Sequence, residues 1–259
     1  MKLRFAVCLF ALAFSACGPA PDTTAEAPAG GMPSAKRVAL PDCAAVEAHD
    51  AGADGWKHPD CRLVFPDPSG LAIEARYAPA EDDSTEVTVQ VVQTGDKTIQ
   101  TFKERMGNTF NGPELVDFDK DGKVDIQLPL ETGNVNTSWA IWRQVEDGKF
   151  VRIQADDLSG VELTKTDSGY IATQGRSSAN EYYVSFYKLI ETKLEPVATI
   201  SVIARGEPDK ITGVDCAVDT DDTSPLGEGL TTKTAEAKFC PEPLVQDLIK
   251  DMAPTPPKP

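Results

Sequence analysis

The chain has little histidine and no closely spaced pair of cysteines. It contains two histidines and six cysteines in 259 residues, and no cysteines are arranged as CxxC. Structural zinc sites need closely spaced cysteine and histidine ligands, so nothing in the sequence indicates zinc. No GxSxG motif accompanies His49 or His58, which we expect to be loop or packing residues. Because no nucleophile, base and oxyanion arrangement can be assembled, we expect a protein that is not an enzyme.

Basic side chains are also scarce. The chain has 25 lysines and arginines against 41 aspartates and glutamates, which gives a formal net charge of −16 at pH 7. A surface of this sign repels nucleic acid and anionic lipid, and it favours basic partners or divalent cations. The simpler interpretation is a charged, solvated surface that maintains solubility. On either interpretation we expect no nucleic-acid partner.

The apolar run at the start of the chain is too short to span a membrane. Lys2 and Arg4 precede an apolar stretch over 5–14, which is the pattern of a secretory signal peptide. We therefore predict that residues 1–16 are a signal peptide. Its removal would make the mature chain more negative by two charges, because both basic residues lie within it.

The stretch FSAC at 14–17 resembles a bacterial lipobox, in which the cysteine is lipidated and becomes the first residue of the mature protein. Each buried methylene of the acyl chains adds about 0.8 kcal/mol of membrane affinity. The alternative is ordinary cleavage near Ala16, which would leave Cys17 as a spare thiol. We expect a protein of the bacterial envelope that faces the periplasm and touches the membrane only through a lipid on Cys17. Gly18, after the cysteine, favours the outer membrane by analogy to known sorting rules.

The rest of the chain divides into a tether, one domain and a tail. Residues 17–40 are rich in Pro, Ala, Gly and Thr and read as a flexible tether. Residues 41–253 fit a single β-rich domain, since all-β domains commonly reach about 200–250 residues. Residues 254–259 read as a disordered tail.

Alternating apolar residues predict an all-β domain. The segment TEVTVQVVQ at 85–93 has the period of two that is typical of a half-buried strand. Trp139 and Trp142 lie three apart on another predicted strand, so we expect one to face the core and the other the surface. Only 243–252 has helical periodicity, with Pro243 in its first turn. The expected fold is a set of antiparallel hairpins in a propeller-like or sandwich arrangement, with one short C-terminal helix. The further strand candidates are 62–65, 71–77, 126–129, 139–144, 150–153, 170–174, 182–190 and 194–203.

Four cysteines lie inside the predicted domain: Cys43, Cys61, Cys216 and Cys240. An even count in an exported chain indicates two disulfides, for which three pairings are possible. We favour Cys43 with Cys61 and Cys216 with Cys240, because each pair of sequence neighbours brackets a segment dense in turn residues. Each closure would stabilise the fold by about 3 kcal/mol on the chain-entropy model.

The sharpest motif is DFDKDGKVD at 117–125. Asp117, Asp119 and Asp121 occupy positions 1, 3 and 5 of a calcium loop, Gly122 permits the turn at position 6, and Asp125 occupies position 9. Lys123, at position 7, would contribute its backbone carbonyl. Four carboxylates in this register would repel one another without a cation, so we predict bound calcium. The alternative is a solvated acidic turn.

From about 115 to 202 the order of features resembles a family of Gram-negative periplasmic lipoproteins. The segments VDFDKDGKVDIQLP, TSWAIWRQVEDGKFVRI and SSANEYYVSFYKLIETKLEPV match a calcium loop of FG-GAP type, a hairpin and a tyrosine-rich hairpin. That family resembles immunity proteins against peptidoglycan hydrolases that rival bacteria deliver through type IV secretion systems. The resemblance implies that Asp117, Asp119, Asp121 and Asp125 are calcium ligands. It transfers no inhibitory residue, because the SGxY motif of some lysozyme inhibitors is not met at 168–171.

Two functional hypotheses follow. The first is a lipid-anchored, calcium-stabilised binding protein that acts as an immunity protein against a basic peptidoglycan hydrolase, which an acidic surface would attract. The second is a general envelope module that binds glycan or another protein, in which calcium serves only the fold.

Overall fold

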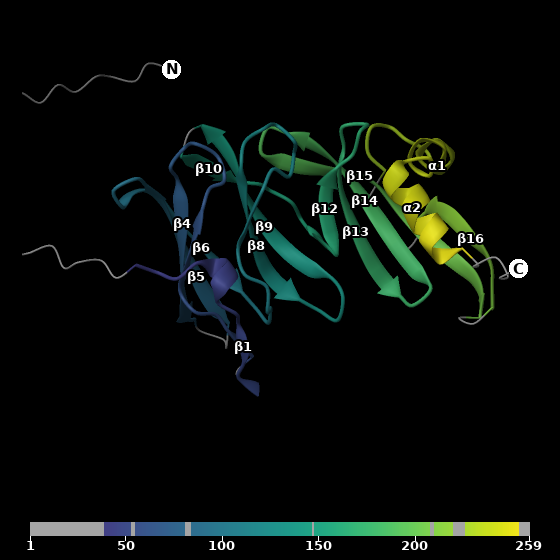
Figure 1. Ribbon diagram of the computed structural model, residues 1–259. Helices are drawn as coiled ribbons and strands as arrows, with labels where there is room; N and C mark the ends of the chain where they lie inside the picture. The colour runs from purple at the N-terminus through teal and green to yellow at the C-terminus, as the bar shows by residue number, and fades with distance from the viewer. Residues whose placement is uncertain are drawn as a thin grey trace, which may run out of the picture. The chain divides into compact units, whose positions relative to one another are not determined.

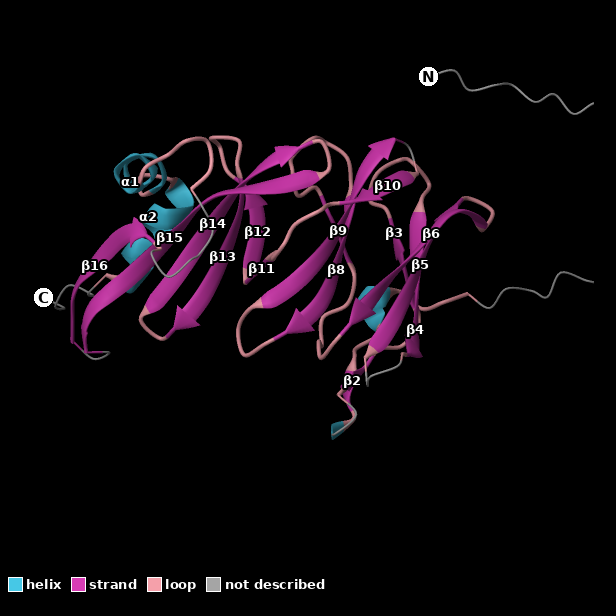
Figure 2. Ribbon diagram, turned by 180° about the vertical axis from the view of Figure 1, so that it is seen from behind, coloured by secondary structure: helices cyan, strands magenta, loops and turns pink. Residues whose placement is uncertain are grey.

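Figures 1 and 2 show the protein as a computed structural model. The structure describes residues 39–52, 55–80, 84–146, 148–207, 210–219 and 226–253, all within the compact unit Ala39–Pro259. The predicted signal peptide, Cys17 with nearly all of the tether, and the tail at 254–259 lie outside the described residues. Among the described helices, none combines the length and the apolar character that crossing a membrane requires.

The first large sheet is a four-stranded antiparallel meander in the order β3-β4-β5-β6. Its second and third strands carry most of its buried side chains, and in β5 the side chains of Val87, Val89 and Val91 are fully buried. The predicted period of two in this segment is therefore confirmed. A short 3-10 helix η1 (Cys43–Ala45) and a hairpin of β1 (His49–Asp50) and β2 (Trp56–Lys57) precede the sheet. The four strands are β3 (Cys61–Val64), β4 (Ala72–Pro79), β5 (Thr85–Gln93) and β6 (Lys97–Met106).

The second and third sheets follow in chain order and are also antiparallel. The second has the order β10-β9-β8-β7, with β11 paired to β9, and the third has the order β12-β13-β14-β15-β16. The second sheet comprises β7 (Glu114–Val116), β8 (Asp125–Thr132), β9 (Thr137–Glu146), β10 (Lys149–Arg152) and β11 (Ser159–Gly160). The third comprises β12 (Glu162–Lys165), β13 (Ile171–Ser178), β14 (Glu181–Ile190), β15 (Lys193–Glu207) and β16 (Lys210–Val218).

Three apolar clusters hold successive layers together. Side chains of β5 and β6 pack against those of β8–β10 in the first cluster, for example Val89 and Phe102 with Leu128. The second cluster joins β9 to the third sheet through Ile141, Ile171 and Leu194. The third sheet packs its other face on two helices, as both views show. The second sheet is therefore covered on both faces.

Because both faces of the second sheet are covered, the expectation that one of the two tryptophans faces the surface is wrong. Trp139 and Trp142 do face opposite ways along β9, but neither points to open solvent. Trp139 is buried between the second and third sheets. Trp142 packs against the first cluster, where its ring stacks on Phe102 with centroids 3.7 Å apart. A strand in a middle layer has no free face, and the sequence of one strand does not show what lies on its two sides.

Two α-helices follow the third sheet, where the sequence predicted one. The predicted helix is present as α2 (Pro243–Met252), with Val245, Leu248 and Met252 buried. An additional helix, α1 (Thr232–Phe239), begins at a capping box formed by Thr231 and Thr234. With that addition the predicted fold class is confirmed: the described residues form mainly antiparallel β-sheet with short helices.

Both disulfides have the favoured pairing. Cys43 is bonded to Cys61, which fastens η1 to β3, and Cys216 is bonded to Cys240, which fastens the end of α1 to β16. Disulfides form and persist in oxidising compartments, so the two bonds indicate an extracytoplasmic protein.

Candidate metal site

The acidic motif forms the loop between β7 and β8. Asp117 organises the loop: its Oδ1 accepts a hydrogen bond from the backbone N–H of Asp121, and its Oδ2 accepts one from the N–H of Gly122, both at 3.0 Å. Gly122 has φ +85°, a left-handed conformation that costs a glycine little. Lys120 also has positive φ, at +52°. The tight turn brings the carboxylates at both ends of the motif to one place.

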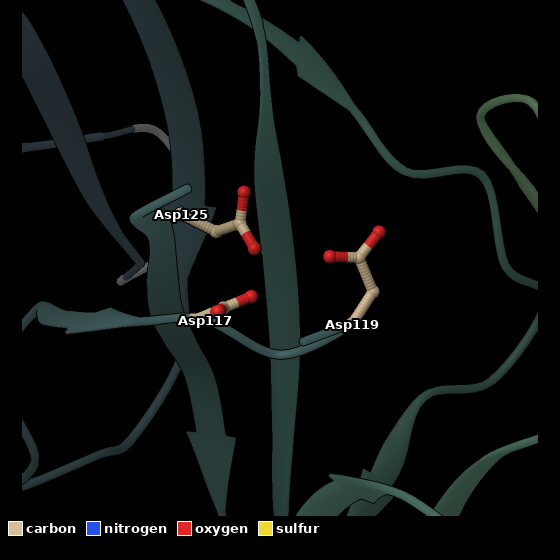
Figure 3. A group of neighbouring side chains, drawn as sticks. All are labelled: Asp117, Asp119 and Asp125. Carbon is tan, nitrogen blue, oxygen red and sulfur yellow. The ribbon is translucent and has the colours of Figure 1, made fainter. Parts of the chain in front are cut away.

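Three carboxylates converge in this loop. Asp117, Asp119 and Asp125 each offer an oxygen, and the three oxygens all lie within 4.8 Å of one another. Figure 3 shows the three side chains directed toward a common space from the loop and from the start of β8. Asp119 and Asp125 are only 2% and 0% exposed, whereas Asp117 is exposed. Two of the three charges are thus removed from solvent.

Asp125 is the first residue of β8, and its carboxylate is held by the backbone. Oδ1 accepts from the N–H of Gln144 at 2.8 Å, and Oδ2 accepts from the N–H of Phe118 at 3.3 Å. Burial raises the pKa of this carboxyl to about 7, and the charges of Asp119 and Asp121 act in the same direction, while the two N–H groups oppose the shift. A cation at the site would favour the ionised form.

One carboxylate oxygen of Asp119 has a hydrogen-bond partner and the other has none. Oδ2 accepts from Arg143 Nε at 2.7 Å, whereas Oδ1 is buried and has no hydrogen-bond partner. A buried carboxylate oxygen without a partner is costly, and a cation would satisfy it.

The oxygens of Asp117, Asp119 and Asp125 fit a calcium ion. Calcium binds oxygens at about 2.3–2.6 Å, so ligands on opposite sides of the ion lie up to about 5 Å apart. The measured spread is compatible with that limit. A bound calcium would take Asp117, Asp119 and Asp125 as ligands, with backbone carbonyls or water completing the six to eight oxygens it prefers.

The side chains of Asp121 and Lys123 have other contacts, whereas the predicted role of the Lys123 backbone carbonyl as a ligand stays a prediction. Asp121 Oδ2 accepts from Arg143 Nη2 at 2.9 Å, and its Oδ1 accepts from the N–H of Lys123. The ammonium of Lys123 donates to the carbonyl of Val145 at 2.8 Å. The structure therefore brings three of the four predicted aspartates together and pairs the fourth with an arginine.

Arg143 is the residue that the motif did not reveal. It lies on β9, 22 to 24 positions beyond the aspartates it contacts. The loop meets β9 because β8 and β9 form an antiparallel pair in which Ile126 lies opposite Trp142. The only signal in the sequence is the hairpin itself, which aligns the start of β8 with the later half of β9.

A pair of lysines fastens the loop to the third sheet. Lys165, at the end of β12, donates to the backbone carbonyl of Asp119, and Lys120 donates to the carbonyl of Lys165 at 2.6 Å. Each lysine thus binds the backbone of the other segment. The acidic loop therefore contacts both the second and the third sheet.

No protein-family model matches this sequence, and no curated protein matches it. A solved structure described as "Structure of a Xanthomonas Type IV Secretion System related protein" has a similar chain, with a TM-score of 0.40 and 10% sequence identity. The similarity covers 66% of this chain and 92% of that one.

Proposed function

We propose that this protein is a calcium-stabilised binding protein of the bacterial envelope, anchored by a lipid on Cys17, that inhibits a basic peptidoglycan hydrolase as an immunity protein does. The observation that carries the proposal is the convergence of Asp117, Asp119 and Asp125 around a buried oxygen of Asp119 that lacks a hydrogen-bond partner. The same residues carry the resemblance to the periplasmic lipoprotein family. The disulfides and the net charge of −16 support export and a basic partner.

In this proposal calcium has a structural role and the protein is not an enzyme. The ion would neutralise the buried carboxylates and fix the loop between the second and third sheets. Binding of the ion to the folded state alone stabilises that state by about 2.7 kcal/mol when calcium is present at a hundred times its dissociation constant. The loop would thereby hold a rigid surface in place for the partner.

Thermal unfolding tests the metal site. The mature chain with Cys17→Ser is heated with calcium and with a chelator, beside a variant carrying Asp119→Ala and Asp121→Ala. We expect calcium to raise the midpoint of the parent and to leave that of the variant unchanged. A matched control carries Asp156→Ala and Asp157→Ala, which removes two exposed carboxylates outside the loop. If the parent does not respond to calcium, the loop is an acidic turn.

The partner is tested separately. The mature protein is used as bait in a periplasmic extract and in the secreted material of competing bacteria, and recovered proteins are assayed for peptidoglycan hydrolysis with and without the bait. Recovery of a hydrolase whose activity falls with the bait supports inhibition. If no hydrolase is recovered and a deletion strain is no more sensitive to rivals, inhibition is wrong.

The second candidate is a general envelope module that binds glycan or another envelope protein. It is favoured by the absence of any inhibitory motif that the family resemblance could transfer to this sequence. A glycan array and crosslinking in intact cells separate the two candidates, since only the module would bind glycan or an envelope protein without affecting a hydrolase.

A further inference from the structure

An aromatic pocket lies away from the acidic loop, beside the first disulfide. It has a volume of about 320 Å³ and is formed by η1, the β1–β2 hairpin, β4 and the segment that links β6 to β7. Four rings from different parts of the chain line it: Trp56, His58, Tyr77 and Phe110. The disulfide between Cys43 and Cys61 forms part of its wall. The disulfide thus fixes one part of the pocket wall, where η1 meets β3.

The rings form two pairs. His58 stacks on Tyr77 with centroids 4.9 Å apart and planes at 25°, while Trp56 and Phe110 meet at 5.6 Å and 59°. Phe110 is 52% exposed although it is a large apolar residue. This exposed ring lines a concave pocket, where a ligand could contact it.

Two polar side chains of the pocket offer hydrogen-bond acceptors. His58 Nε2 lies 2.8 Å from the carbonyl of Thr109, which can only accept, so Nε2 carries the hydrogen. Burial lowers the pKa of His58 below its usual 6.5, which favours the neutral ring and leaves Nδ1 as an acceptor. Asn111 uses its amide N–H₂ toward the hydroxyls of Thr132 and Thr137, which leaves its carbonyl oxygen as the acceptor.

The charge of the lining is negative. Glu47 contributes an exposed carboxylate, and no lysine or arginine is among the described residues that line the pocket. Aromatic faces attract a cation through the ring quadrupole, and a guanidinium also stacks flat on such faces while donating hydrogen bonds at its edge. Electron-rich rings, acceptor atoms and one carboxylate together match a planar cation with many donors.

We propose that this pocket binds the guanidinium group of an arginine side chain presented by a protein partner. The inference rests on the proposed function, because a basic partner is what would present such a side chain. Trp56 and Phe110 would contact the guanidinium plane, and Glu47 would pair with its N–H groups. Arginine and tryptophan are among the residues that most often dominate binding energy at protein interfaces.

Histidine-selective NMR tests the pocket with a small probe. The mature protein has two histidines, and His49 lies on β1 outside the pocket lining, so it serves as an internal reference. We expect Nα-acetyl-arginine amide to shift the His58 ring signals saturably, with a millimolar dissociation constant. Nα-acetyl-citrulline amide has nearly the same shape without the charge, and it should bind about 2- to 30-fold more weakly. Equal responses to the two probes, or none to either, would overturn the inference.

Two variants locate the probe. Phe110→Ala removes a half-exposed ring and should weaken binding of the arginine probe about 2- to 30-fold, and Glu47→Gln should weaken it in the same direction. Ile203→Ala, which truncates a 39% exposed side chain on β15, is the matched control and should bind as the parent does. Full binding to Phe110→Ala would place the probe elsewhere. Shifts of His58 on addition of an N-acetylglucosamine oligosaccharide, with none for arginine, would assign the pocket to glycan instead.

The pocket and the proposed function fail in distinguishable ways. If a hydrolase is recovered and binds Phe110→Ala as tightly as Ile203→Ala, the pocket inference is wrong and the proposed function stands. If no hydrolase is recovered while His58 still responds to arginine alone, the hydrolase proposal is wrong and the cation pocket stands. Loss of hydrolase binding confined to Phe110→Ala and Glu47→Gln supports both.

Discussion

Arg143 Nε lies 2.7 Å from Asp119 Oδ2, so strand β9 supplies a cation to the loop that precedes β8. The side chain of Arg143 is 23% exposed and that of Asp119 is 3% exposed, which makes this a largely desolvated ion pair. Its second contact, to Asp121, means that one arginine offsets two of the four negative charges of the motif. The acidic loop therefore lies beside a fixed positive charge, that of Arg143 on β9.

Replacing Arg143 should increase the dependence of stability on calcium. Arg143→Gln leaves the buried carboxylate of Asp119 without its ionic partner, so we expect the chelated protein to lose about 3 kcal/mol of unfolding free energy. Calcium should recover part of the loss, because it offsets the same charge. Urea unfolding with calcium and with chelator measures both. Arg152→Gln, which breaks an ion pair between β10 of the second sheet and Glu104 on β6 of the first, is the control and should show no calcium-dependent difference.

Gly175 should not tolerate a side chain. It lies opposite Tyr183 in the β13–β14 pair, and a β-carbon added to it would overlap the ring of Tyr183. We expect Gly175→Ala to destabilise the fold by about 1–3 kcal/mol, because the ring must leave its position. Combining it with Tyr183→Ala should cost less than the sum of the two single changes, as measured by urea unfolding. Additive costs would show that the overlap is not the cause.

Stability should fall in mildly acidic solution through His58. Burial lowers the pKa of its folded state below the usual 6.5 of the unfolded state. The unfolded chain therefore binds the proton more readily, and this contribution to stability is present above about pH 6.5 and is lost as the pH falls toward the folded pKa. His58→Gln cannot titrate, so it should lose less stability than the parent between about pH 7.5 and pH 5. His49→Gln, on the exposed hairpin, should follow the parent.

The two disulfides should protect different parts of the fold. Replacing Cys216 and Cys240 with serine should cost about 3 kcal/mol and release α1 and α2 first, because Cys240 directly follows α1. Hydrogen exchange should then show faster exchange in the helices than in the first sheet. Replacing Cys43 and Cys61 should cost a similar amount and leave α1 protected. If both pairs affect the same amides, the layers do not open separately.

The sequence predicted features that depend on neighbours along the chain. The buried valines of β5, the helix α2 and the two disulfide pairings each depend on a short local pattern, and the structure confirms them. Edge strands β6 and β16 were not predicted, because an edge strand with one covered face carries many polar residues and its apolar period is weak. Helix α1 was missed for a related reason, since in TKTAEAKF only Ala235 and Phe239 are buried.

In the candidate sites, too, the sequence reveals the residues that form a local pattern and misses those that are brought together by folding. Asp117, Asp119 and Asp125 stand in a register that can be recognised in nine residues, and the structure brings them together. Arg143 and the pocket around Phe110 cannot be recognised in this way, because their contacts join segments more than twenty residues apart. Such contacts depend on which strands pair and which layers meet, and single-strand periodicity carries no such information.

Reciprocal hydrogen bonds of Lys120 and Lys165 connect the acidic loop to β12 in the third sheet. Lys120 and Lys165 each donate to the backbone of the other segment, so a rearrangement that moves Lys120 or Asp119 would change the hydrogen bonds of Lys165, the last residue of β12. If the loop binds calcium as proposed, amide exchange in β12 should slow when calcium is added, although the three converging carboxylates all lie outside β12. Hydrogen exchange in β12, an edge strand of the third sheet, would then report on a cation bound at the edge of the second sheet.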